Sequence, residues 1–189
     1  PDQAGILGIA CDLPGFADRA THKQGHLSGI DSIIEIPLLR WDYAEYYAGD
    51  LDAIDEAYAR HGSFIDSAEL FDNEFFSLSS SESSTMAPEQ RRLLEVSLQS
   101  LQDAGCVHHK LKFMQIGVFV GQEPSDWEEV IASSSAFSAT GLAHCMSANR
   151  ISFFLGLKGP SMVINTACSS SLVALDAGWR SVKGKRCSS

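Results

Sequence analysis

Residues 162–175 constrain the fold of this chain more than any other stretch. They read Met-Val-Ile-Asn-Thr-Ala-Cys-Ser-Ser-Ser-Leu-Val-Ala-Leu. The β-branched run before Asn165 predicts a strand, and the three serines after Cys168 begin an apolar-periodic segment that predicts a helix. A strand that turns sharply into a helix places Cys168 at the turn, where α/β sheets carry their functional groups.

Cys168 is therefore the candidate nucleophile. Backbone N–H groups at a helix N-terminus point at a group placed there, and the helix dipole favours negative charge. This field stabilises a thiolate, the nucleophilic form of cysteine. The same N–H groups can hold the oxyanion of a tetrahedral acyl intermediate. The alternative is a buried, inert cysteine, the usual state of a free thiol.

The polar neighbours of Cys168 have structural roles in this interpretation. Ser169, Ser170 and Ser171 are expected to bind unpaired N–H groups at the helix start, or to permit close packing, rather than to act as nucleophiles. Asn165 is expected to brace the turn through hydrogen bonds to the backbone, as Asx side chains often do.

The other patterns predict an α/β fold. Short apolar runs predict strands at residues 4–10, 33–36 and 116–121. Residues 16–30 predict a loop with at most one helical turn, and residues 40–67 predict loops that cover the core. Helices are expected from Pro88 to Gly105, within residues 124–133, over residues 146–155, and from Cys168 to about residue 182, with a loop at residues 133–135. Strands alternating with helices are typical of a parallel or mixed sheet covered by helices.

Charge excludes some function classes and divides the chain. The formal net charge is −10, which argues against general nucleic-acid binding. Residues 1–140 carry 23 acidic and 8 basic side chains, whereas residues 141–189 carry 1 acidic and 6 basic ones. The nucleophile thus lies in the basic part of an acidic chain. Either an acidic partner docks there or the cations sit on a solvated helix end near its C-terminus.

The cysteines and the apolar runs indicate the compartment. Five widely spaced cysteines without a Cys-x-x-Cys pair argue against a disulfide framework and a zinc site, and for a reducing environment. No apolar run is long enough to span a bilayer, and residues 1–4 lack a secretory pattern. We expect a cytoplasmic excerpt of a longer chain, whose true N-terminus could have carried an organelle address. The pair His108-His109 is expected to be solvated.

The stretch around Cys168 closely resembles the active-site elbow of β-ketoacyl synthases, the condensing domains of polyketide and fatty acid synthases. The family pattern runs Asp-Thr-Ala-Cys-Ser-Ser-Ser-Leu-Val-Ala-Leu, and Asn165 here replaces the Asp. Other blocks resemble the family in its order: residues 8–15, 37–47, 71–76, 86–91, 117–121 and 148–161. The Arg40-Trp41-Asp42 segment favours the polyketide-synthase branch, although animal-type fatty acid synthases are similar, so a related fatty acid synthase stays an alternative.

The resemblance departs from the family at several places. Residues 16–30 lack the usual aromatic-rich helix, and residues 77–86 are unusually rich in serine. Ala87 replaces an acid that would cap the following helix, at a cost of about 1 kcal/mol. Gly178 replaces part of a more apolar helix face and weakens its helix by about 1 kcal/mol against alanine.

The resemblance implies a fold and a reaction. Residues 1–189 would form the N-terminal half of a thiolase-like α/β domain. Cys168 would accept an acyl chain from the phosphopantetheine of an acyl carrier protein, and the complete enzyme would condense it with a malonyl-type extender by decarboxylation. Neither a bound cofactor nor a metal is implied. The complete domain is expected to form a homodimer that acts on acyl thioesters.

The histidines leave alternatives open. In the family, two histidines downstream of the cysteine assist decarboxylation, but all six histidines here precede Cys168. By itself the chain is therefore not expected to complete condensation, and the fragment alone is expected to be inactive as a condensing acyltransferase. A ketosynthase that only transfers acyl groups is an alternative, as is a cysteine thioester hydrolase that uses His61 or His144. A catalytically dead dimer partner is disfavoured because such partners usually lack the cysteine.

Overall fold

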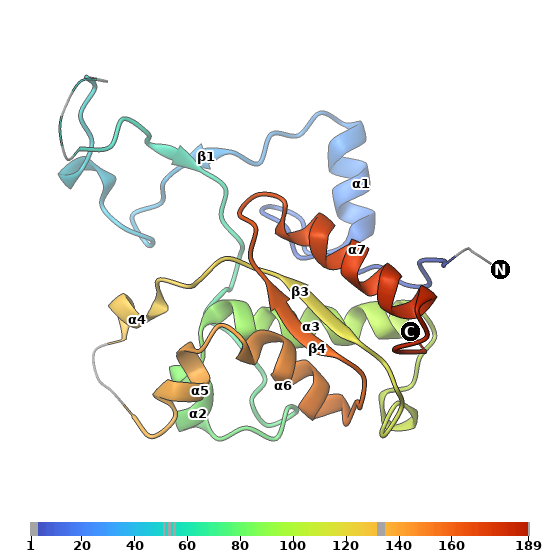
Figure 1. Ribbon diagram of the computed structural model, residues 1–189. Helices are drawn as coiled ribbons and strands as arrows, with labels where there is room; N and C mark the ends of the chain where they lie inside the picture. The colour runs from blue at the N-terminus through green and yellow to red at the C-terminus, as the bar shows by residue number, and fades with distance from the viewer. Residues whose placement is uncertain (1–3, 51, 53, 55, 132–134, 189) are drawn as a thin grey trace. The chain divides into compact units, whose positions relative to one another are not determined.

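The computed structural model describes residues 4–50, 52, 54, 56–131 and 135–188 (Figure 1). The chain forms two compact units. One comprises Pro1–Ala10 and Ala68–Ser189, and the other comprises Cys11–Ser67. Cys168 belongs to the first unit, so the first unit positions the candidate nucleophile.

A pair of parallel strands lies at the centre of the first unit. Strand β3 (Val118–Gly121) pairs with β4 (Ser161–Ile164), in a register that runs from Val118 opposite Ser161 to Gly121 opposite Ile164. The connection between them contains α4 (Trp127–Val130), α5 (Ser138–Leu142) and α6 (Met146–Leu155). Parallel strands require such a long crossover, so the predicted α/β class is confirmed.

Helices cover both faces of β3. Its side chains alternate: Phe119 lies against Gly178 of α7 (Ser170–Lys183), whereas Val120 packs into the core. Figure 1 shows α7 alongside the strand pair. The core joins the strand to α3 (Pro88–Asp103) and α6, and it contains Phe76, Met86, Leu94, Leu111, Val120, Ala148, Ile151, Leu155 and Leu157.

Three of the predicted helices are confirmed with their end signals. Pro88 occupies the first turn of α3, and Gly105 follows that helix with a φ of 71°. Ala87 is the N-cap of α3 and provides no polar side chain, as the resemblance implied. Gly156 ends α6 in the left-handed conformation with a φ of 67°, and α7 stops at Gly184.

Other helices were shorter than predicted or were not predicted. Of the described residues 124–131, Trp127–Val130 form α4, and α5 follows without a sequence prediction. Residues 132–134, which include most of the expected loop, lie outside the described residues. The serine-rich segment forms α2 (Ser80–Thr85), because Ser79 caps it by accepting a hydrogen bond from the Glu82 N–H at 3.1 Å. His108 belongs to the exposed 3-10 helix η2 (His108–Lys110).

The predicted strand at residues 4–10 is wrong. This segment has no strand pairing among the described residues, and Ile6 is 72% exposed. Its backbone instead binds α3: the Ile9 N–H donates to Asp103 Oδ2 at 2.9 Å, and Ser100 Oγ donates to Gly8 O at 3.3 Å. A strand needs a neighbouring strand to satisfy its backbone, whereas here helix side chains do so.

In the second unit, the predicted loop at residues 16–30 is also wrong. It contains α1 (Arg19–Leu27), which Asp18 caps by accepting a hydrogen bond from the Thr21 N–H at 2.8 Å. Hydrogen bonds from Thr21 lower the pKa of the Asp18 carboxyl below its usual value. Gly25 is not a helix breaker but a close contact, since a Cβ there would lie 2.1 Å from the Phe16 ring.

The remainder of the second unit agrees with the sequence prediction only in part, because a short strand lies within the predicted loop at residues 40–67. The strand expected at residues 33–36 is present as β1 (Ile34–Glu35), which pairs antiparallel with β2 (His61–Gly62). Between them the described residues are irregular apart from the 3-10 helix η1 (Tyr43–Glu45). Among the described residues of both units, none of the helices combines the length and apolarity that crossing a membrane requires.

Candidate active site

Cys168 lies exposed at the turn between β4 and α7. The predicted strand, turn and helix are all present, and the alternative of a buried thiol is wrong for this residue. The preceding residue, Ala167, has a φ of 52°. A residue with a Cβ pays about 1–2 kcal/mol for this left-handed conformation, so its surroundings must hold the turn in place.

Side chains bind the backbone on the N-terminal side of Cys168. Asn165 Oδ1 accepts a hydrogen bond from the Ala167 N–H at 3.0 Å, which confirms the predicted brace. Ser170 Oγ accepts from the Thr166 N–H at 2.8 Å and donates to the Ala167 carbonyl at 2.7 Å. The elbow is therefore held by local side-chain bonds, as Asx and serine turns are.

The three serines behave differently from one another. Ser169 is the N-cap residue, but its hydroxyl donates to Thr166 O at 2.8 Å instead of accepting from a helix N–H. Ser170 is buried and binds an N–H of the elbow, whereas Ser171 is exposed. Ser170 thus binds an N–H, but that of Thr166 in the elbow and not one at the helix start, and Ser169 binds no helix N–H among the described residues. The alternative role, close packing, applies to Ser170, which lies against Gly121.

Gly121 supports the elbow from the neighbouring strand. A Cβ built at this residue would lie 2.5 Å from both the Ser170 carbonyl carbon and the Ser171 nitrogen, so backbone meets backbone there. Only glycine permits this approach without displacement. Sequence reasoning did not find this role, although a glycine at the end of a predicted strand is a signal of close backbone approach.

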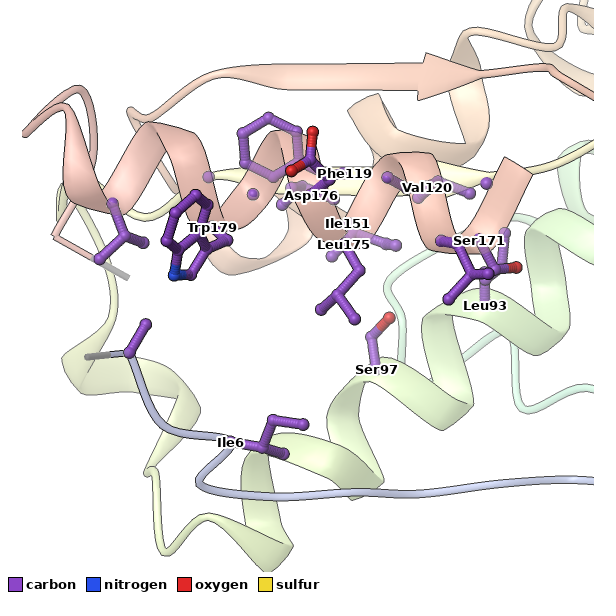
Figure 2. A pocket seen from close by; sticks show the side chains of 18 of the residues that line it. Ile6, Leu93, Ser97, Phe119, Val120, Ile151, Ser171, Leu175, Asp176 and Trp179 are labelled. Carbon is purple, nitrogen blue, oxygen red and sulfur yellow. The ribbon is translucent and has the colours of Figure 1, made fainter. Parts of the chain in front are cut away.

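An open cleft of about 930 Å³ runs beside α7 (Figure 2). It extends from Ser171 in the first turn of α7 to Val182, with Ser97 of α3 and Ile6 opposite. Figure 2 shows Leu175 and Ser97 facing the space between the two helices. Leu175 is 60% exposed and Trp179 is 40% exposed, so this face of α7 is largely apolar and uncovered by the described residues.

The histidines do not form a site in the described residues. His144 Nε2 is buried without a hydrogen-bond partner there, and His61 belongs to the second unit. His108 and His109 are exposed, as expected. Within the described ranges, no group of three or more His, Cys, Asp or Glu side chains could hold a metal ion.

The other thiols and the basic residues have ordinary environments. All five cysteines are free; Cys187 is buried, Cys11 and Cys106 are half-buried, and Cys145 is exposed like Cys168. At the end of α7, Arg180 Nε lies 2.8 Å from Asp176 Oδ2, and Lys183 Nζ lies 4.9 Å from the centre of the Trp179 ring. These contacts favour the interpretation of a solvated helix end.

A parallel strand pair covered by helices, with a cysteine at the strand-to-helix elbow, is the α/β arrangement that the resemblance to the thiolase-like family implied. Comparison with known sequences gives the same class. Residues 3–189 match the β-ketoacyl synthase N-terminal domain, and the chain belongs to this family.

Related proteins of the same kind include two bacterial polyketide synthases. The chain is 37% identical over 188 residues to the pikromycin polyketide synthase component PikAII of Streptomyces venezuelae, a match that covers 96% of the chain and 5% of the relative. It is 35% identical over 189 residues to a phenolphthiocerol/phthiocerol polyketide synthase of Mycobacterium tuberculosis, and this match covers 95% of the chain and 9% of that protein.

Solved structures with this fold include ketosynthases. The oxazolomycin ketosynthase domain of Streptomyces albus superimposes with a TM-score of 0.88 at 33% identity, over 96% of this chain and 33% of that one. A ketosynthase from module 6 of the bacillaene synthase of Bacillus subtilis gives a TM-score of 0.83 at 29% identity, over 96% and 30%. The chain thus corresponds to about a third of each ketosynthase.

Proposed function

We propose that residues 1–189 form one N-terminal part of a polyketide-synthase ketosynthase, in which Cys168 accepts the acyl chain. The observation that carries this proposal is the exposed thiol at a braced elbow, in a chain similar to ketosynthases over 96% of its length. In the loading step the Cys168 Sγ attacks the thioester carbonyl, and a new C–S bond forms. The bond to the donor sulfur breaks, and the released thiol takes the proton.

The acyl donor in this proposal is the phosphopantetheine thioester of an acyl carrier protein, because the relatives are polyketide synthases. The phosphopantetheine arrives on the carrier, so the chain itself needs no resident cofactor. In the complete domain the acyl group would then join a malonyl-type extender with loss of carbon dioxide. We place this chemistry in the cytoplasm, where thiols stay reduced, and in a homodimer.

We assign only acyl loading to residues 1–189. Decarboxylation in this family uses two histidines downstream of the cysteine, and all six histidines here precede Cys168. The loading step is common to elongating and acyl-transferring ketosynthases, so both share this assignment. We also propose that the apolar cleft beside α7 is covered by the remainder of the ketosynthase domain, since an apolar helix face of this kind needs a partner.

The loading step can be tested on this chain with a small acyl N-acetylcysteamine thioester. Trypsin cuts after Lys158 and Arg180, which gives a peptide with Cys168 as its one cysteine. We expect the acyl mass on this peptide, and its loss in Cys168→Ala. Cys145→Ala is the matched control because Cys145 is also exposed. Equal labelling of both cysteines would contradict the proposal.

The same experiment separates loading from hydrolysis. A ketosynthase nucleophile retains the acyl group in a stoichiometric adduct, whereas a thioester hydrolase releases it to water and turns over. Continued release of the acid, abolished by His144→Ala or His61→Ala, would favour the hydrolase instead. We expect one acyl group per chain and no dependence of loading on these histidines.

A further inference from the structure

We propose that Ser170 is a positioning residue for acyl transfer, because it orients the N–H of Cys168 toward the developing oxyanion. This inference rests on the function proposed above. Ser170 is 5% exposed, so its hydroxyl is shielded from water. It does not itself contact the thioester in this proposal; it acts through the peptide bond that precedes the nucleophile.

The hydroxyl of Ser170 is held in one arrangement by its two partners. A serine hydroxyl has one proton to donate and lone pairs to accept with. Because the Thr166 N–H is a donor, Oγ accepts there at 2.8 Å, and its proton is left for the Ala167 carbonyl at 2.7 Å. The Ser170 N–H also donates to this carbonyl at 3.0 Å. The Ala167 carbonyl is thus fixed by two donors.

Fixing this carbonyl also fixes the N–H of the nucleophile. The carbonyl of Ala167 and the N–H of Cys168 belong to one planar peptide unit, in which they point in opposite directions. The carbonyl is bound on the side of α7, so the N–H of Cys168 points away from Ser170. A donor that must meet an oxyanion has to be oriented before the reaction begins.

The backbone would not keep this orientation unaided. Ala167 has a φ of 52°, which is unfavourable for a residue with a Cβ. Without the Ser170 hydroxyl, the Thr166 N–H loses its partner, and the Ala167 carbonyl keeps only the Ser170 N–H. The turn can then relax, and the peptide plane can rotate. Gly121 also limits the movement of Ser170, since a Cβ at Gly121 would lie 2.5 Å from the Ser170 carbonyl carbon.

Two reactions of Cys168 distinguish positioning from general stability. Acylation by a thioester forms a tetrahedral oxyanion, whereas alkylation by iodoacetamide displaces iodide and forms none. Both can be followed on the tryptic peptide of Cys168 in the 189-residue protein. We would compare wild type with Ser170→Ala, with Ser170→Thr, which keeps a hydroxyl, and with Ser171→Ala, whose side chain is exposed. Leu155→Ala, which changes a core residue, serves as a variant that is only destabilised, and its two rates are compared with those of Ser170→Ala under conditions where both proteins are folded to the same fraction.

We expect Ser170→Ala to slow acylation by at least about tenfold and alkylation by less than about threefold, because misplaced groups lose catalytic effect steeply. Ser170→Thr should recover acylation, and Ser171→Ala should match wild type. In Ser170→Ala the Thr166 amide should exchange its hydrogen faster. The proposal is overturned if acylation of Ser170→Ala stays at the wild-type rate. It is also overturned if acylation and alkylation of Ser170→Ala slow by the same factor, the result expected for Leu155→Ala as a variant that is only destabilised.

Failure of the proposed function gives a different result. If wild-type Cys168 is alkylated but is never acylated, acyl loading by this chain is refuted. Hydrogen exchange of the Thr166 amide in Ser170→Ala then tests the structural part of the proposal alone, which is that the Ser170 hydroxyl holds the Thr166 N–H. Faster exchange than in wild type supports this role, and unchanged exchange overturns it.

Discussion

The Cys168 elbow and the surroundings of Arg150 are both held by polar contacts, but the contacts have different ranges. At the elbow, the partners of each side-chain hydrogen bond are separated by two to four residues along the chain. Arg150 is 8% exposed and binds Glu82, Gln90 and Thr140, which are 68, 60 and 10 residues away. The elbow is therefore a local device, whereas the Arg150 network exists only once α2, α3, α5 and α6 have assembled.

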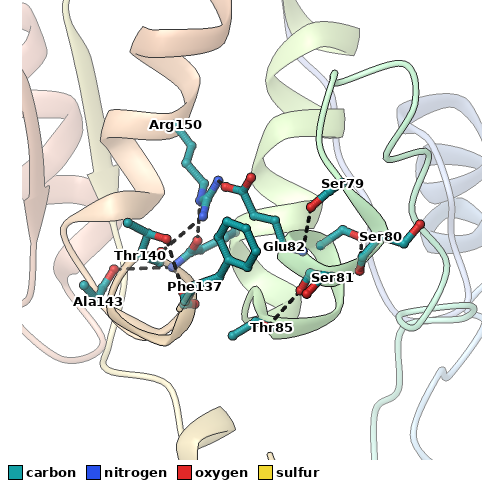
Figure 3. Close-up of polar contacts among 12 residues, drawn as sticks. Ser79, Ser80, Ser81, Glu82, Thr85, Phe137, Thr140, Ala143 and Arg150 are labelled. Atoms are coloured by element: carbon teal, nitrogen blue, oxygen red, sulfur yellow. Dashed lines mark hydrogen bonds and ion pairs between the residues drawn. The ribbon is translucent and has the colours of Figure 1, made fainter. Parts of the chain in front are cut away.

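Figure 3 shows this network around the Arg150 guanidinium. Its Nη1 lies 2.7 Å from Glu82 Oε1, and its Nε donates to Gln90 Oε1 at 2.8 Å. Gln90 Nε2 in turn donates to the Gly141 carbonyl at 2.9 Å. Buried charges are costly unless paired in this way, and removing one partner leaves the others uncompensated.

Substitution of Arg150 should have the largest effect on stability. Arg150→Met leaves Glu82 and Gln90 without their partner, and we expect a loss of about 3–5 kcal/mol in the free energy of unfolding. Urea unfolding followed by circular dichroism measures it. Arg180→Met is the control, because Arg180 and Asp176 form an exposed ion pair on α7, in which Arg180 Nε lies 2.8 Å from Asp176 Oδ2. Equal effects of the two substitutions would contradict the importance of the network.

Gly121→Ala tests whether the elbow depends on anything beyond its local bonds. The new Cβ would lie 2.5 Å from the backbone of Ser170, so the first turn of α7 must move. We expect a loss of about 1–3 kcal/mol from overpacking, together with slower acylation of Cys168. Urea unfolding measures the loss of stability, and labelling of the Cys168 peptide by the thioester measures the acylation rate. Unchanged labelling would show that the local bonds suffice.

Substitution of Asn165 tests whether the local hydrogen bonds of the elbow contribute to stability. Asn165→Ala removes the acceptor of the Ala167 N–H and should cost about 1 kcal/mol. Asn165→Asp keeps a carboxylate oxygen in that place and restores the residue usual in ketosynthases, so it should retain wild-type stability and labelling. Thermal unfolding of the three proteins decides the matter, and a loss in Asn165→Asp as large as in Asn165→Ala would refute the acceptor role.

Gly178→Ala should have the smallest effect, and in the opposite direction. Its Cβ would lie 3.4 Å from Phe119 Cδ2, an ordinary contact, and alanine favours the helix. We therefore expect stabilisation by up to about 1 kcal/mol. It also serves as the matched control for Gly121→Ala, since both glycines contribute to the packing of α7 on β3. A destabilised Gly178→Ala variant would mean that this packing tolerates no added methyl group.

The sequence by itself determined the elbow, α3, α6 and α7, because their signals act within a few residues. Asn165 reaches its partner two residues away, and Pro88 and Gly156 mark helix ends through their own backbone preferences. The thiol at the turn was therefore predictable, and so was the bracing role of Asn165.

Only the tertiary structure decided the contacts between distant segments. The apolar run at residues 4–10 fits a strand by pattern, but whether a strand forms depends on a neighbouring strand, and α3 binds this backbone instead. In the sequence, Gly25 and Gly121 cannot be distinguished from glycines that mark turns. In the structure each permits a close contact within its own unit, Gly25 with Phe16 and Gly121 with Ser170. The partners of Arg150 depend on helix packing over as many as 68 residues of chain. Local patterns carry no information on such distances, because packing selects the partners only after the elements meet.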